Sequence, residues 1–188
     1  MSTAQTTDMP PETIAKALAT HLFPDDGELL SYAVLDGASV PDLLDQLYGD
    51  EPPEFVCLYR GELDPDLAEV APYLVQLSPE SAFTKWLLEN CLGNHWGIFV
   101  TSTEDIETLR RHFRNFLMVK NPEGKQVYFR FYDPRVLRVF LPTCKAEEME
   151  TLFGPLDSYL CEAVNPDTLL SFSVEDGLPQ CKPVKLFQ

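Results

Sequence analysis

The chain has 188 residues, of which 45% are hydrophobic and 23% are charged. Disordered chains combine low hydrophobicity with high net charge, so this composition indicates a folded domain with its own core. The net charge of −16 argues against nucleic acid as a partner, because phosphate binding requires lysines and arginines. No apolar run approaches the ~18 residues that cross a bilayer, so we expect no membrane insertion.

The charge is unevenly distributed along the sequence. Residues 1–94 carry seventeen acids and three bases, a net charge of −14, whereas residues 95–145 carry nine bases and five acids, a net charge of +4. Residues 146–188 carry eight acids and two bases, a net charge of −6. This pattern fits two surfaces that face each other, separate surfaces for different partners, or an acidic face that only aids solubility.

The cysteines and the N-terminus both bear on the compartment. The five cysteines have no short paired spacing and are odd in number, which argues against a disulfide framework and favours reduced thiols. The first twelve residues are polar and acidic, without the basic and apolar regions of a secretory signal. We therefore expect a cytoplasmic protein.

Helices and strands alternate along the chain. Segments with apolar residues at helical spacing are predicted to begin at Pro11, Pro41, Asp64, Ser78, Ser102 or Thr103, Asp133 and Thr143. Short segments rich in β-branched and aromatic residues are predicted as strands at residues 28–35, 54–59, 73–77, 96–101, 127–132, 158–164 and 169–174. The helix that starts at Ser78-Pro79-Glu80 is expected to end at Gly93.

This alternation predicts an α/β fold in a single domain, with a mixed, partly parallel sheet and helices packed on its faces. We expect residues 1–27 to form an N-terminal helix and lead-in, and residues 28–155 to form the α/β core. Residues 156–188 are expected to add C-terminal strands and an irregular tail from Glu175 onward.

The most β-prone stretch of the sequence stops at an Asp-Pro step. Residues 127–132 alternate as a central strand does, with odd and even positions on opposite faces. Asp133 suits a helix N-cap, and Pro134 suits the first helical position. Arg130 and Arg135 flank this turn, and either can form a bidentate pair with Asp133. Such a pair is a structural clasp or a recognition point for a partner's carboxylate.

Several blocks of this sequence resemble the adaptor family of bacterial type VI secretion, the effector chaperones often called Tap or Tec adaptors. The blocks are YLVQL at residues 73–77, KWL at 85–87, WGIF at 96–99, LRRHF at 109–113 and FRFYDPRVL at 129–137. YAVLDGA at residues 32–38 resembles the family's opening strand, and the resemblance covers roughly residues 29–155. It implies that the protein binds one effector in the cytoplasm and helps mount it on the secretion spike, without being secreted. It implies no catalytic residues.

The groups with catalytic or metal-binding chemistry are weakly supported. Cys91, Asn94 and His95 are the raw material of a thiol hydrolase, but Cys91 falls at the end of an amphipathic helix, where nothing in the sequence lowers its pKa. Cys91 and His95 with His112 and Cys144 are a conceivable metal site without the usual short ligand spacing. No glycine-rich phosphate loop is present. We therefore expect no enzyme activity, no metal and no other cofactor.

A binding role requires a free strand edge or an apolar groove for a partner helix. Aromatic residues are the usual anchors of such surfaces, and the aromatic residues considered are Trp96, Tyr128, Tyr132 and Phe172. The candidate partner-binding residues are Trp96, Tyr128, Arg130, Tyr132, Asp133 and Arg135. For each aromatic residue the simpler interpretation is that it covers a helix–sheet interface.

The sequence thus predicts a non-enzymatic cytoplasmic adaptor or chaperone. Its expected partners are the cognate secreted effector and the spike protein of the secretion machine. Two alternatives stay open: an immunity protein that neutralises a toxin, and a small hydrolase that uses Cys91 and His95.

Overall fold

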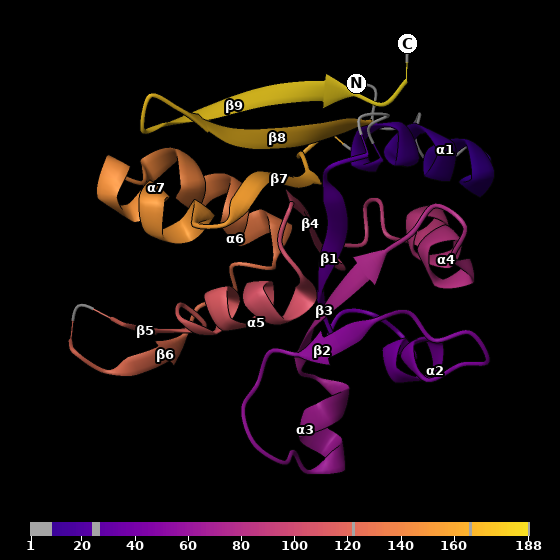
Figure 1. Cartoon of the computed structure of the whole chain (residues 1–188), viewed down its shortest axis with the longest axis horizontal. Coiled ribbons are helices and arrows are strands. Elements are labelled where there is room, and N and C mark those ends of the chain that lie inside the picture. Colours follow the sequence, from indigo (N-terminus) through magenta and orange to yellow (C-terminus); the bar gives the residue numbers. More distant parts are fainter. Residues whose placement is uncertain (1–8, 24–26, 122, 166, 188) are drawn as a thin grey trace.

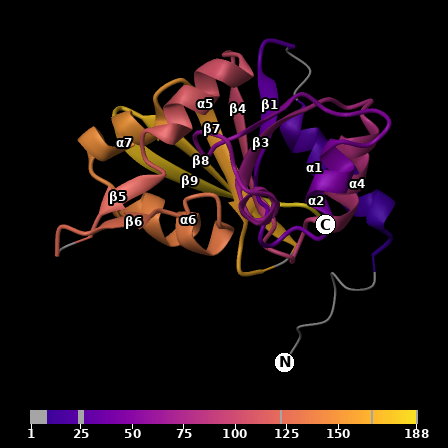
Figure 2. The same ribbon diagram turned by 90° about the horizontal axis from the view of Figure 1, so that it is seen from below.

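A seven-stranded sheet separates two layers of helices in the computed structural model, which describes residues 9–23, 27–121, 123–165 and 167–187 (Figures 1 and 2). Its strands lie in the order β2-β3-β1-β4-β7-β8-β9. Their bounds are β1 (Leu30–Asp36), β2 (Phe55–Cys57), β3 (Pro72–Leu77), β4 (Gly97–Ser102), β7 (Leu156–Glu162), β8 (Thr168–Glu175) and β9 (Leu178–Lys185).

All neighbouring strands of this sheet are antiparallel. The single α/β domain is confirmed, but the expected partly parallel sheet is wrong. The reason lies at the centre, where β1 pairs with β3 on one side and with β4 on the other. β3 and β4 therefore run in the same direction, as a crossover through a helix requires, but β1 lies between them and pairs antiparallel with both.

Each face of the sheet is covered by three helices. One face carries α1 (Pro11–Leu22), α2 (Leu43–Leu47) and α4 (Ala82–Asn90), and the other carries α5 (Ile106–Arg114), α6 (Pro134–Phe140) and α7 (Ala146–Phe153) (Figures 1 and 2). A short 3₁₀ turn, η2 (Leu141–Thr143), follows α6, and α3 (Pro65–Glu69) has no buried residue. β1 serves both cores, with Tyr32 and Val34 on the α5 side and Ala33 and Leu35 on the α4 side.

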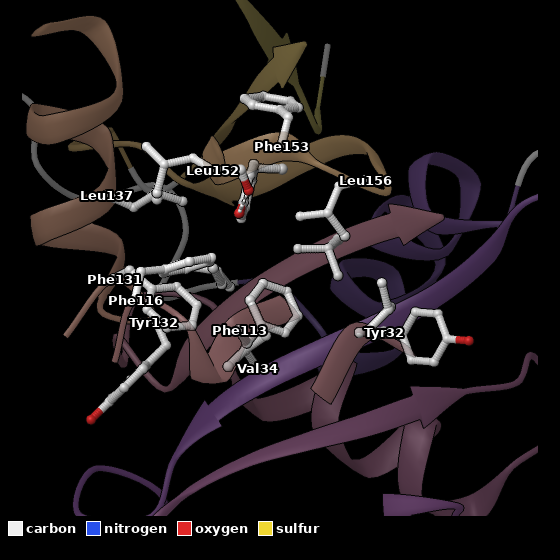
Figure 3. Close-up of a cluster of buried hydrophobic side chains, with 14 of the residues drawn as sticks. Tyr32, Val34, Phe113, Phe116, Phe131, Tyr132, Leu137, Leu152, Phe153 and Leu156 are labelled. Atoms are coloured by element: carbon white, nitrogen blue, oxygen red, sulfur yellow. Dashed lines mark hydrogen bonds between the residues drawn. The ribbon is translucent and has the colours of Figure 1, made fainter. Parts of the chain in front are cut away.

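The predicted central strand at residues 127–132 is wrong. Only β6 (Gln126–Tyr128) is a strand, and it pairs with β5 (Met118–Lys120) in a separate two-stranded hairpin that projects from the molecule (Figure 1). After β6 the chain turns, and Phe131 and Tyr132 are both buried. Phe131 stacks on Phe113 at 5.3 Å and meets Phe116 edge-on at 4.8 Å, as the aromatic core in Figure 3 shows. Packing on α5 thus overrides the β-propensity of this stretch.

Two predicted helix starts are displaced because other residues supply the cap. α4 begins after Ser81, whose hydroxyl accepts from the Thr84 N–H, whereas the Ser78 N–H donates to the Thr84 hydroxyl. α5 is capped by Asp105. The Ser102 hydroxyl instead donates to the Pro155 carbonyl at 2.7 Å and so joins β4 to the start of β7.

Two further helix ends also differ from prediction. α4 ends at Asn90, with Cys91 as its C-cap, rather than at Gly93. α7 begins after Lys145, and Thr143 lies in η2, where its hydroxyl donates to the Phe140 carbonyl at 2.7 Å. The start of α7 is instead held by Glu148, whose carboxylate accepts from the Lys145 N–H at 2.8 Å.

The expected irregular tail is wrong, because β9 pairs with β8 along its whole length. The connecting residues Asp176 and Gly177 both have positive φ, at 54° and 75°, as a two-residue hairpin turn requires. An Asp-Gly pair between two β-prone segments is a strong hairpin signal, which the prolines at positions 179 and 183 obscured.

Candidate functional site

The Asp-Pro turn at Asp133 starts helix α6, and Asp133 forms an ion pair there. Asp133 caps α6 by accepting from the Arg135 N–H at 2.9 Å. The Arg135 guanidinium donates to both carboxylate oxygens, from Nε at 3.0 Å and from Nη2 at 2.7 Å. Burial alone would raise the pKa of Asp133, but the hydrogen bonds and charge of Arg135 hold it below its usual value.

Arg130 pairs with Asp36 rather than with Asp133. Asp36 is the buried last residue of β1, and it also accepts from the Ala38 N–H at 3.2 Å and the Ser39 hydroxyl at 2.8 Å. The pair therefore anchors the chain that leaves the β5–β6 hairpin to the centre of the main sheet. Because both carboxylates are occupied by groups of this chain, the geometry supports the clasp interpretation of this turn.

Most of the aromatic candidates belong to the two cores. Trp96 is buried and stacks on Trp86 at 5.3 Å, and Phe172 is fully buried. Tyr132 is buried with its hydroxyl pointing away from the aromatic cluster, as Figure 3 shows. Tyr128 is different, because 59% of it is exposed. Alternation along a strand separates core from surface only when one face of the sheet meets solvent, and here helices cover both faces.

The structure does not assemble a nucleophile from Cys91 and His95. Burial raises the pKa of the Cys91 thiol to about 12, which disfavours the reactive thiolate. His95 pairs through Nδ1 with Glu162 at the end of β7. The other oxygen of Glu162 accepts from the Gly93 N–H at 2.7 Å, so this contact secures the loop before β4.

The four residues considered for a metal do not come together. Cys91 lies in the core on the α4 side of the sheet, whereas Cys144 lies in the core on the α5 side. His112 is bound through Nε2 to the Leu152 carbonyl at 2.9 Å. In the part of the chain that the structure describes, no three His, Cys, Asp or Glu side chains are grouped for a metal ion.

A surface cavity beside Tyr128 is the site that sequence reasoning missed. We call it the hairpin groove; it has a volume of about 250 Å³ and is lined by Leu58, Tyr59, Arg60, Leu63, Leu67, Arg114, Leu117, Met118 and Tyr128. Leu67 of α3 and Met118 of β5 are 42% and 40% exposed. The sequence offered one signal for the hairpin, the turn predicted after residue 120. The strand before that turn was not recognised because it follows closely after α5.

Two contacts hold the walls of the hairpin groove in place. The Tyr59 and Tyr128 rings lie 5.3 Å apart, so the hairpin packs against the segment after β2. The Arg114 guanidinium donates to the carbonyls of Cys57, Leu58 and Tyr59, at 3.1 and 2.9 Å for the first two. The end of α5 is thereby tied to the chain between β2 and α3.

Both edges of the main sheet are poorly suited to accept a partner strand. In β9 the backbone N–H and C=O groups of even-numbered residues point toward β8, as the bond from the Leu186 N–H to the Asp167 carbonyl shows. Pro179 and Pro183 therefore occupy positions whose N–H groups would point away from the sheet. β2 has three residues, and Arg114 occupies the outward Cys57 carbonyl. Compared with these two edges, the hairpin groove is the better surface for a partner.

Comparisons with known proteins place the chain in a family. No helix in residues 9–23, 27–121, 123–165 or 167–187 has the length and apolar character needed to cross a membrane. A search of the curated proteins and a search of the solved structures each found no match. The family model described as Domain of unknown function (DUF4123) matches residues 31–151, from β1 into α7. That family is known as an adaptor domain associated with type VI secretion effectors. Because the match spans more than half of the 188 residues, the chain belongs to the DUF4123 family.

Proposed function

We propose that this protein is a non-enzymatic adaptor that binds one type VI secretion effector in the cytoplasm and helps load it onto the spike. Membership of the DUF4123 family supports an effector-associated role. The observation that carries the proposal is the hairpin groove, where apolar side chains from α3 and from the β5–β6 hairpin are exposed together. Exposed apolar side chains that converge on one cavity are typical of a protein-binding surface.

The state of the chemically reactive groups supports binding rather than catalysis. Glu162 holds His95, and Arg135 holds Asp133, so each of these groups already has a partner within the chain. The Cys91 thiol is buried with a raised pKa. Groups that serve catalysis need access to the reacting atoms and a pKa suited to proton or electron-pair transfer.

The groove also favours an adaptor over an immunity protein. An acidic immunity protein would meet a basic toxin with carboxylates, but two arginines and no acid line the hairpin groove. The net charge of −16 is therefore carried by surfaces other than this apolar one.

Co-expression with the effector encoded beside the gene tests the proposal. We expect the tagged protein to co-purify with that effector, and the soluble yield of the effector to fall when the protein is omitted. The bound effector should keep its activity, because an adaptor binds away from the active site. Inhibition of the effector would support the immunity alternative, and absence of co-purification would refute the adaptor proposal.

A further inference from the structure

We infer that the hairpin groove binds an acidic amphipathic helix of the effector, whose apolar face enters between α3 and the β5–β6 hairpin and whose carboxylate pairs with Arg60. This inference rests on the proposed function, since it names the part of the effector that the adaptor recognises. Its support comes from the size of the groove, its charge and the state of the sheet edges.

The groove is sized for side chains of a partner protein. Its volume of about 250 Å³ lies below the roughly 300–1,000 Å³ typical of small-molecule sites. Its rim combines Leu67, Met118 and Tyr128, all substantially exposed. An exposed tyrosine beside aliphatic side chains provides the aromatic anchor that is typical of binding hot spots.

The charge of the groove selects an acidic partner although the whole chain is acidic. Arg60 is exposed, and no ion pair of Arg60 occurs among the residues that the structure describes. Burial and then the nearby charges of Arg110 and Arg60 lower the pKa of Arg114, so three guanidinium groups lie close together. Arg110 pairs with Glu107 and Arg114 binds backbone carbonyls. Arg60 is thus the cation left to meet a partner's carboxylate.

The charges around this surface limit where that carboxylate lies. The segment that carries Arg60 also carries Glu62, Asp64 and Asp66, but none of these lines the groove. A partner's carboxylate is therefore favoured only at the Arg60 wall, while its apolar side chains face Leu67 and Tyr128. Such an arrangement gives the bound segment a defined orientation.

The sheet edges favour a helix as the bound segment. A partner strand needs a row of free backbone groups, but Pro179 and Pro183 interrupt the outer edge of β9, and Arg114 occupies a carbonyl of β2. The main sheet therefore offers no favourable edge for a partner strand. An amphipathic helix presents an apolar stripe with a charged flank, which matches the lining of the groove.

Two pairs of matched substitutions test this inference by measuring the Kd for the purified effector. Tyr128→Ser in the groove is compared with Tyr48→Ser on the opposite face, where Tyr48 is 71% exposed and contacts Phe55 edge-on at 5.1 Å. Arg60→Glu is compared with Lys85→Glu on α4, which changes the net charge equally. We expect Tyr128→Ser and Arg60→Glu to raise Kd by about tenfold or more, and both controls to stay within about twofold of wild type.

A charge-swap experiment identifies the pairing group. Replacing single acids by lysine in the effector segment should weaken binding to the wild-type protein, and one such change should restore binding to the Arg60→Glu variant. If the wild-type protein does not bind the effector, the proposed function fails. If it binds but Tyr128→Ser and Arg60→Glu, shown by circular dichroism to be folded, bind equally well, the adaptor role stands and the groove inference is refuted.

Discussion

At the scale of single residues, His112 shows how one side chain joins two helices. Its Nε2 lies 2.9 Å from the Leu152 carbonyl, which links α5 to α7. Gly154 follows α7 with φ of 45°, and a Cβ there would lie 2.7 Å from a ring atom of His112. The glycine is therefore required both for its backbone conformation and for the close approach of the ring.

Burial of His112 predicts a pH-dependent stability. Burial lowers its pKa, although the hydrogen bond to Leu152 acts in the opposite direction. The unfolded chain takes up a proton near pH 6.5, while the folded chain keeps the ring neutral to lower pH. Stability is therefore lost as pH falls from about 6.5 towards the lower folded pKa. We expect the urea midpoint to fall less between pH 7 and pH 5 in His112→Gln than in wild type.

The exposed His21 of α1 provides the control for this measurement. His21→Gln makes the same substitution at an exposed position and is measured at the same two pH values. An equal pH dependence in His112→Gln and wild type would show that burial of the His112 ring does not contribute to it.

At the scale of elements, α5 and α6 start in the same way but at different depths. Asp105 caps α5 by accepting from the Thr108 N–H at 2.7 Å, and its side chain lies in solvent. Asp133 caps α6, is buried and is also held by the Arg135 guanidinium. The loss of a buried cap that has a charged partner costs more than the loss of a solvated one.

We therefore expect Asp133→Ala to lower the free energy of unfolding by about 2 kcal/mol. Asp105→Ala should lower it by less, because water replaces the lost acceptor. Urea denaturation of both variants at neutral pH measures the difference. Equal losses would mean that the Arg135 contact adds nothing to the stability of the α6 start.

At the scale of the whole molecule, one sheet belongs to two cores. Successive residues of β1 enter opposite cores, so neither core can be lost while β1 stays buried. The strands β7–β9 continue the same sheet beyond β4. This arrangement predicts one cooperative unfolding transition.

The tryptophans make this prediction measurable. Trp86 and Trp96 stack on each other on the α4 side, so tryptophan fluorescence reports that core, whereas far-ultraviolet circular dichroism reports both helical layers. We expect the two signals to change at the same urea concentration. Separate midpoints would show that the two sides of the sheet unfold independently.

The sequence by itself determined the features that depend on neighbouring residues. It correctly predicted β1, β3, β4 and the amphipathic helix α1, because apolar spacing reflects which side chains face a core. It also predicted the cap at Asp133 and a pair with one of the flanking arginines, Arg130 or Arg135, but it did not decide between them. The strand expected across residues 127–132 was wrong beyond Tyr128, since local β-propensity carries no information about the packing of Phe131 on Phe113 and Phe116.

Only the tertiary structure decided the features that depend on distant partners. Arg130 meets Asp36, 94 positions earlier, because the strand order brings the end of β1 beside the chain that leaves the hairpin. Trp96 and Phe172 are buried because helices cover both faces of the sheet. The hairpin groove joins α3, the end of α5 and the hairpin, which are separate in sequence. Local propensity cannot specify such contacts, because they form only when the chain has chosen which surfaces to bury together.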